Sequence, residues 1–261
     1  HKEGDFSPYL YKSTDLGETW TSISSNLPKR TLVWRLVQDH VSKELMFCAT
    51  ESAIYVTLDG GKKWNKVPGA PTISFRDITI QKRENDLVAA SFGRGFYVLD
   101  DYSSLREMTA TNLTKEGALF NTRDALWYIP KSTTGNTGAD YYFADNPEFG
   151  AVFTYHLSKS YPSMKGSRVK KEKEMIKKGQ QIPKINWDAI EKESREEGTK
   201  VFIVIKDLEG NIINKINAPK SKGLNRVAWN LRYSSSSAIN PDRISSGRGG
   251  GRGWYNSGQL A

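Results

Sequence analysis

The sequence has few of the residues that build disulfides and metal centres. It contains one cysteine and three histidines among 261 residues. A single cysteine excludes an intrachain disulfide, and because Cys48 lies in the apolar run "ELMFCAT" (44–50), we predict a small buried side chain rather than a reactive thiol. His1, His40 and His156 are far apart, with no cysteine or carboxylate at ligand spacing. We therefore expect neither a metal site nor a cofactor.

Long hydrophobic runs and nucleotide-binding motifs are also missing. No stretch approaches the roughly 20 apolar residues of a membrane-spanning helix, so we expect no transmembrane segment. There is no G-x-S-x-G motif, no Walker-type loop and no dinucleotide fingerprint. These absences argue against three large classes of enzyme.

The sequence has an excess of positive charge. The formal net charge is +9, and much of it lies in "KGSRVKKEKEMIKKGQQ" (165–181) and in the Arg residues of the C-terminal tail. Neither segment interleaves basic residues with aromatic ones on a single surface. We interpret the excess as a solvated basic face and expect no nucleic-acid partner, with a specific polyanion site as the alternative.

The first half contains a repeat. The octets "STDLGETW" (13–20) and "TLDGGKKW" (57–64) place an Asp two residues before a Gly and five before a Trp, and Asp15 and Asp59 are 44 residues apart. A weaker third copy, "ASFGRGFYVLDD" (90–101), has lost the Gly and the Trp, so we expect a different turn there. Among repeat architectures, this period is typical of four-stranded propeller blades.

Within each period, short apolar and β-branched runs alternate with polar breaks. The alternation is close to two residues, which predicts strands rather than helices. The runs are "TLVWRLVQD" (31–39), "ELMFCAT" (44–50), "AIYVTLD" (53–59) and "KKWNKVP" (62–68), followed by "ISFRDITIQ" (73–81), "DLVAASF" (86–92) and "GFYVLDD" (95–101).

Every residue of the octet has a folding role between two antiparallel strands. The Asp carboxylate can accept hydrogen bonds from N–H groups of the turn, and the Gly can adopt a positive φ. The Ser or Thr two residues earlier can add a hydroxyl bond, while the Trp packs back on the sheet. We therefore predict that Asp15 and Asp59 are structural.

The octet resembles the Asp-box, or bacterial neuraminidase repeat. That repeat occurs in sialidases, xyloglucan-cleaving glycosidases, sortilin-like receptors and bacterial propellers classed as glycosyl hydrolases. The resemblance implies a hairpin turn at the blade periphery, away from the central channel where substrates bind. The matching positions are Ser13, Asp15, Gly17, Thr19 and Trp20 in the first copy, and Thr57, Asp59, Gly61 and Trp64 in the second, where Lys63 replaces the Thr.

The second half has a different composition. We expect an all-β chain, with a partial β-propeller over 1–105 and a linker or last blade strand over 106–140. A β-sandwich follows over 141–233, with a charged, partly helical insertion over 161–198, and a flexible Gly/Ser/Arg-rich tail over 234–261. The strings at Ile205 to Ile212 and Gly223 to Tyr233 resemble those of immunoglobulin-like modules that follow many bacterial propellers.

Two smaller assignments leave alternatives open. In the insertion, "NWDAIEKESREE" (186–197) has helical composition with Asn186 as N-cap, against the alternative of a disordered linker. The Arg- and Gly-rich tail is interpreted as a flexible excursion, against the alternative of an RNA-binding tract.

A propeller needs four or more blades to close its ring. About two and a fraction are recognisable here, so we expect the chain to be a C-terminal section of a larger protein, with the other blades in the same or another chain.

Two functions remain. The first is a glycan- or protein-binding scaffold, secreted or in the cell envelope as the family resemblance implies. The second is part of a glycoside hydrolase, which needs two carboxyls across a cleft, or a Tyr nucleophile with arginines in the sialidase manner. The candidate acids Glu51, Asp77, Asp100 and Asp101 are isolated in the sequence, so the catalytic residues of such an enzyme would lie outside this chain.

Replacement of Asp15 by Ala should lower stability, because it removes the acceptor of the turn. Any activity per folded molecule should stay unchanged. Urea unfolding and a binding or activity assay normalised to folded protein test this together. A selective loss of activity at full stability would contradict the structural role.

Overall fold

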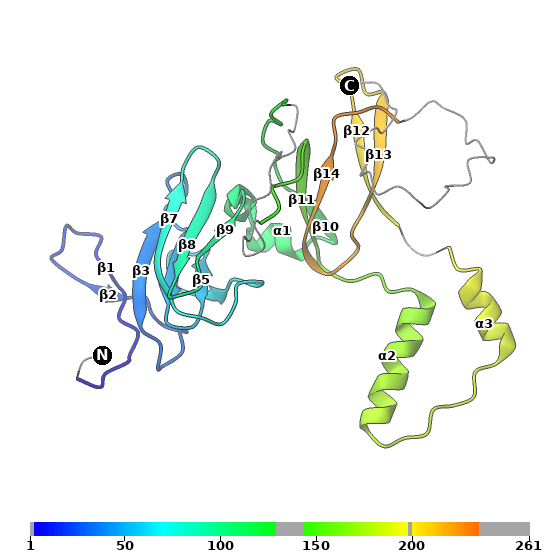
Figure 1. Cartoon of the computed structure of the whole chain (residues 1–261), viewed down its shortest axis with the longest axis horizontal. Helices are drawn as coiled ribbons and strands as arrows, with labels where there is room; N and C mark the ends of the chain where they lie inside the picture. Colours follow the sequence, from blue (N-terminus) through cyan, green and yellow to red (C-terminus); the bar gives the residue numbers. More distant parts are fainter. Residues whose placement is uncertain (1–2, 129–143, 198–199, 235–261) are drawn as a thin grey trace, which may run out of the picture. The chain divides into compact units, whose positions relative to one another are not determined.

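The computed structural model describes residues 3–128, 144–197 and 200–234, and the chain divides into unit 1 (His1–Asn112) and unit 2 (Leu113–Ala261). Strands dominate both units, as expected for an all-β chain (Figure 1). No helix among the described residues is long and apolar enough to cross a membrane. The tail, 235–261, lies outside the described residues.

Unit 1 consists of three antiparallel sheets in sequence order. The predicted strands are confirmed, and each sheet is a simple meander. The sheets are β1 (Tyr11–Lys12) with β2 (Thr21–Ser22); β3 (Val33–Gln38), β4 (Met46–Thr50), β5 (Ile54–Thr57) and β6 (Asn65–Lys66); and β7 (Phe75–Gln81), β8 (Asp86–Ser91) and β9 (Phe96–Leu99).

Strand β4 is buried on both faces, which explains why its sequence is continuously apolar rather than alternating. Leu45, Phe47 and Ala49 face one core cluster, which they share with Phe75, Ile78 and Leu87 of the third sheet. Met46 and Cys48 face a second cluster, with Leu10, Ile23, Leu27 and Trp64. The middle sheet is therefore covered on each side by a neighbouring repeat (Figure 1).

Cys48 is fully buried, as predicted. Burial raises the pKa of its thiol to about 12. The side chain therefore stays protonated and acts as a small apolar group at neutral pH.

A buried ion pair ties the β3–β4 turn to the segment after β9. Asp39 is 5% exposed, and Arg106 of the 3-10 helix η1 (Ser103–Glu107) donates to it from Nε and Nη2 at 2.8 Å each. The Tyr102 hydroxyl donates to Asp39 at 2.7 Å, and the N–H of Ser42 donates at 2.7 Å. Burial alone would raise the pKa of Asp39, but the Arg106 guanidinium and these donors hold it well below its usual range.

Unit 2 contains a three-stranded and a two-stranded antiparallel sheet. β10 (Gly117–Leu119), β11 (Ala151–Leu157) and β14 (Gly223–Trp229) form the first, in the order β10-β11-β14. β12 (Val201–Lys206) and β13 (Ile212–Ala218) form the predicted hairpin around "LEGN". Its turn is held by Asp207, which accepts from the N–H groups of Glu209 and Asn211 at 3.0 and 2.7 Å.

The segment 106–140 contributes a strand that sequence reasoning did not place. α1 (Ala110–Thr114) follows η1, and β10 then pairs with β11 from Gly117↔Leu157 to Leu119↔Tyr155. β10 lies within this segment and extends the sheet of unit 2. Three residues are too short for a periodic signal.

The insertion contains two helices, as its composition predicts. α2 (Met164–Lys177) begins after Ser163, whose side chain accepts from Gly166 N–H, and α3 (Trp187–Ser194) begins after the expected N-cap, Asn186. Neither helix buries a residue, so capping and ion pairs rather than a core support them.

Asp39→Ala should lower the free energy of unfolding by about 3 kcal/mol, because it leaves the Arg106 guanidinium inside unit 1 without its carboxylate. The contribution of a carboxyl with a depressed pKa is complete above the unfolded value of about 3.9 and is lost as pH falls through the folded value. The difference between wild type and variant in urea titrations should therefore be full at pH 7 and smaller, but not zero, at pH 2 to 3, because the folded-state pKa of Asp39 lies below that range. Asp77→Ala, at an exposed ion pair, is the control and should cost less than about 1 kcal/mol.

Candidate functional site

The turn of the first octet, 13–20, is closed by its own side chains. Asp15 Oδ1 accepts from the Ser13 hydroxyl at 2.8 Å and from Thr19 N–H at 2.9 Å, and Oδ2 accepts from the Thr19 hydroxyl at 2.5 Å. The N–H of Gly17 donates to Ser13 Oγ at 2.7 Å. The Thr19 and Ser13 donors lower the pKa of Asp15 to about 2.

The second turn repeats this pattern. Asp59 Oδ1 accepts from the Thr57 hydroxyl at 2.7 Å and from Lys63 N–H at 2.9 Å, while Gly61 N–H donates to Thr57 Oγ1 at 3.0 Å. Partial burial opposes ionisation, but the Lys63 and Thr57 donors leave the pKa of Asp59 below its ordinary value. Both aspartates therefore act as ionised turn acceptors, and neither has a role as a proton donor at neutral pH.

The third copy makes a different turn, as its missing Gly and Trp predict. Asp101 Oδ1 accepts from Ser103, at 3.2 Å from the N–H and 2.5 Å from the hydroxyl. Tyr102 follows it and is buried in the core against Phe47, with ring centroids 5.0 Å apart. The third turn is therefore held by the buried Tyr102 ring and lacks the Asp-x-Gly pattern of the first two turns.

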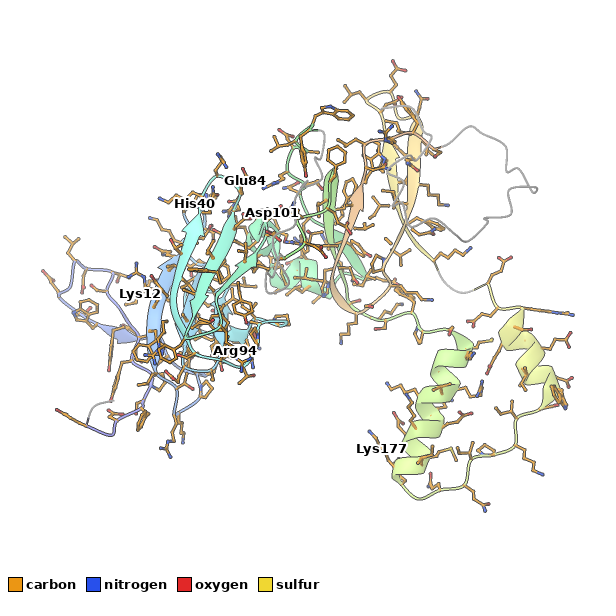
Figure 2. The ribbon with its side chains drawn as sticks, in the orientation of Figure 1. Lys12, His40, Glu84, Arg94, Asp101 and Lys177 are labelled. Carbon is orange, nitrogen blue, oxygen red and sulfur yellow. The ribbon has the colours of Figure 1, made fainter. Side chains whose placement is uncertain are left out.

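A cluster of charged and aromatic side chains lies at the end of the unit 1 sheets that is opposite the turns described above. Figure 2 shows His40, Glu84 and Asp101 toward one end and Arg94, in the β8–β9 turn, at the other. The starts of β3 and β7, the β4–β5 turn and the β8–β9 turn all lie at the Arg94 end, because the sheets are antiparallel meanders. We call the side chains gathered there the Trp34 cluster; its members are Trp34, Arg35, Glu51, Arg76, Asp77 and Phe92.

Matching β-bulges position this cluster. The register shifts between Val33 and Arg35 on β3, and between Phe75 and Asp77 on β7, so Trp34 and Arg76 are each the extra residue of a bulge. The two bulges are 42 residues apart, close to the 44 residues that separate Asp15 from Asp59. A bulge re-aims a side chain out of the regular alternation, and bulges are frequent next to functional sites.

The side chains of the two extra residues, Trp34 and Arg76, are in contact with each other. The Arg76 guanidinium carbon lies 3.8 Å from the centroid of the Trp34 ring and 5.1 Å from that of Phe92. Trp34 Nε1 donates to Glu51 Oε2 at 2.7 Å, and Arg76 Nη2 lies 4.0 Å from Glu51 Oε1. Stacking on the ring and contact with the carboxylate fix the guanidinium in one orientation.

The cluster also brings together two of the candidate acids. Glu51 faces Arg76, and Asp77 lies 3.5 Å from Arg35 Nε. The cluster is accessible, since Phe92 is 70% exposed and Arg35, Glu51, Arg76 and Asp77 all keep a large part of their side chains in solvent. It therefore offers aromatic faces, hydrogen-bond donors and carboxylate acceptors to a ligand. Asp101 belongs to the third turn instead, and Asp100 directly precedes it.

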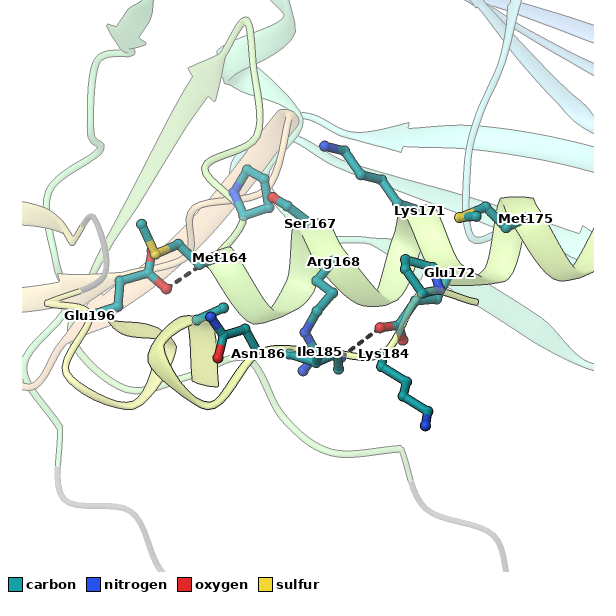
Figure 3. Close-up of a pocket in the computed structure, with 13 residues that line it drawn as sticks. Met164, Ser167, Arg168, Lys171, Glu172, Met175, Lys184, Ile185, Asn186 and Glu196 are labelled. Carbon is teal, nitrogen blue, oxygen red and sulfur yellow. Dashed lines mark hydrogen bonds and ion pairs between the residues drawn. The ribbon is translucent and has the colours of Figure 1, made fainter. Parts of the chain in front are cut away.

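A second candidate is the space between the two helices of the insertion. A cavity of about 540 Å³ is lined by residues of α2, of α3 and of their connection (Figure 3). Its central cation, Arg168, donates to Glu193 at 2.7 and 3.0 Å and to Glu172 at 2.8 Å. These carboxylates neutralise the guanidinium, so we interpret the arrangement as an ion-pair link between the two helices.

Among the described residues, no group of three or more His, Cys, Asp and Glu side chains could hold a metal ion. Comparisons with protein-family models, curated proteins and solved structures find no match to the chain. The site is therefore interpreted from its own geometry.

The two octets predict their turns, whereas no motif in the sequence predicts the Trp34 cluster. Its one available signal is that positions 34 and 76 are equivalent in the repeat and carry an aromatic residue and a cation, which can stack on each other.

The two tryptophans of the octets differ in burial, so their replacement should differ in its cost to stability. Trp64 is 2% exposed and Trp20 is 63% exposed. Trp64→Ala should lower the free energy of unfolding by about 3–5 kcal/mol because it leaves a cavity, whereas Trp20→Ala should cost less than about 0.5 kcal/mol. Urea unfolding of both variants tests the difference, and equal costs would contradict it.

Proposed function

We propose that unit 1 is a set of Asp-box propeller blades and that the protein is a secreted or envelope scaffold that binds a glycan or a protein. The Trp34 cluster is the contact surface, and a glycan is the ligand whose chemistry it suits best. The observation that carries the proposal is the stack of Arg76 on Trp34, built by equivalent bulges in two successive repeats.

The cluster's chemistry supports a saccharide. A sugar ring has a face of C–H groups that packs on an aromatic ring and a rim of hydroxyls that bond to carboxylate and guanidinium groups. Phe92 supplies an exposed ring, and Arg76 and Glu51 supply a donor and an acceptor beside it. The half-buried Trp34 holds both charged groups in place.

The location of the cluster is consistent with the propeller. β3 and β7 are the first strands of their sheets and lie next to each other. In Asp-box propellers, ligands bind at the central channel, which the first strand of each blade lines. Under the same proposal, unit 2 is an immunoglobulin-like module after the blades.

The glycoside hydrolase is the second candidate, and the presence of Glu51 and Asp77 in one cluster favours it. Each acid faces an arginine, however. Hydrolysis needs one carboxyl to donate a proton and the other to act as base or nucleophile. The acids of such an enzyme would come from blades outside this chain.

Binding to an array of immobilised neutral and acidic oligosaccharides, followed by calorimetry with the best binder, tests the proposal. Trp34→Ala and Arg76→Ala should each weaken binding by about 10-fold or more, or about 1.4 kcal/mol. Trp20→Ala removes an exposed indole that does not belong to the cluster, and this control should bind as wild type does.

Two outcomes would count against the scaffold. Release of sugar from aryl-glycosides by the purified chain would contradict the scaffold and would place the acids of a hydrolase within this chain. Equal glycan binding by wild type, Trp34→Ala and Arg76→Ala would remove the cluster from the ligand site.

A further inference from the structure

A groove extends along α2 on the side that faces α3 and the connection between the two helices. The α2 residues that line the cavity of about 540 Å³ recur every three or four positions, so they form one stripe of the helix: Met164, Ser167, Arg168, Lys171, Glu172 and Met175. At 1.5 Å per residue, this stripe is roughly 17 Å long, or about three helical turns. We call the cavity the α2–α3 groove. Its length fits a helical segment, whose side chains follow the same spacing.

Part of the groove lining is apolar and stays in contact with water. Met164 and Met175 of α2 lie there with Ile185 of the connection and Ala189 of α3. Met164 is 53% exposed and Ile185 is 38% exposed, and neither helix buries a residue. Covering such side chains is favourable, and methionine adapts its shape to different partners. A partner with apolar side chains along one face would therefore be stabilised in this groove.

The carboxylates of the groove already have donors within the insertion. Arg168 Nη1 donates to Glu172 Oε1 at 2.8 Å, and the N–H of Met164 donates to Glu196 Oε2 at 2.7 Å. Arg168 also pairs with Glu193, so its guanidinium has two carboxylate partners. These contacts hold the helices together and do not select a basic ligand.

The lysines of the groove have no such partners. Lys171 and Lys184 line it, and Figure 3 shows them extending to opposite sides with Arg168 between them. Neither lysine forms an ion pair with any residue that the structure describes. Six basic residues of α2 against two acidic ones leave this helix with a net charge of +4. A second copy of the chain would bring the same charge to the interface, whereas an acidic partner is complementary to it.

Two features distinguish the groove from a surface that binds nucleic acid. Among the described residues that line it, none is aromatic, so it has no platform on which bases stack. Glu172 and Glu196 lie in the same lining as the two lysines and would repel a continuous row of phosphates. A helix with one apolar face and carboxylates beside it avoids both difficulties.

We propose that the α2–α3 groove binds an acidic, amphipathic helix of another protein. The apolar face of that helix covers Met175 and Ile185, and its carboxylates pair with Lys171 and Lys184. Recognition of this kind takes its affinity from a few apolar anchors and its orientation from charges at the rim. The proposal goes beyond the glycan surface of unit 1 and does not depend on it, because the groove belongs to unit 2.

Fluorescence anisotropy of a labelled peptide, titrated with the full chain at low ionic strength, tests the proposal. The peptide has about five helical turns, or roughly 18 residues, with Leu at every third or fourth position and Glu and Ala elsewhere. Two control peptides should bind at least about 5-fold more weakly. One carries Gln in place of Glu, and the other keeps the composition but scatters the Leu residues around the helix.

Two double variants with the same change in net charge separate the groove from the rest of α2. Lys171→Gln with Lys184→Gln should weaken binding of the acidic peptide by at least about 3-fold, because two ion pairs are lost. Lys170→Gln with Lys173→Gln, at exposed positions outside the lining, should change it by less than about 2-fold. Gln forms helices nearly as well as Lys, and circular dichroism checks that each variant keeps its helices.

Met175→Gln and Ile176→Gln are a second matched pair. Met175 lines the groove, while Ile176 is 59% exposed and lies outside the lining. Met175→Gln should weaken binding by about 5-fold or more, because it removes an apolar contact, and Ile176→Gln should bind as wild type does. Trp34→Ala in unit 1 should also bind the peptide normally, so this result is separable from the glycan assay.

Absence of peptide binding up to about 1 mM would overturn the proposal. Equal losses in the two lysine double variants would do the same, because the attraction would then come from the general positive charge of α2. Tighter binding of single-stranded oligothymidylate than of the acidic peptide, unchanged by Met175→Gln, would identify a nucleic-acid surface instead.

Discussion

Unit 1 depends on strand β4 being covered on both faces. One strand cannot bury two faces by itself, so it requires a sheet on each side, and the neighbouring repeats supply them. Phe47 and Ala49 pack toward the third sheet, while Met46 and Cys48 pack toward the first. This requirement makes the repeats cooperative, because removal of either neighbour would expose apolar surface worth about 25 cal/mol for each Å².

Polar contacts also join neighbouring repeats to one another. Asn26 bridges the backbone of Trp64 across one boundary between repeats, and the Asp39–Arg106 pair with Tyr102 joins the β3–β4 turn to the segment after β9. The Asp39–Arg106 pair is shielded from solvent, where an unsatisfied partner is costly, so it specifies register as well as adds stability. The end that carries the Trp34 cluster is built differently, from exposed side chains on bulges. The tightly packed repeats of unit 1 thus carry the accessible Trp34 cluster at one end.

Much of unit 1 follows from local pattern. Short apolar and β-branched runs located β3 to β9, and the octets located both of their turns with the donors and acceptors. The "LEGN" hairpin and the Asn186 cap were found in the same way, from turn and capping chemistry. The short strand β10 was missed because three residues carry no period, and its pairing with β11 is decided by residues about 40 positions away.

The sequence by itself determined the turns, because their hydrogen bonds join residues within four positions of each other. It therefore established that Asp15 and Asp59 are structural acceptors. Tertiary structure decided which indole is buried, since Trp20 and Trp64 occupy identical positions in their octets and differ in their neighbours. It also brought Trp34 onto Arg76, 42 residues along the chain. Such contacts depend on how sheets pack and where bulges turn the side chains, and neither is encoded within a single repeat.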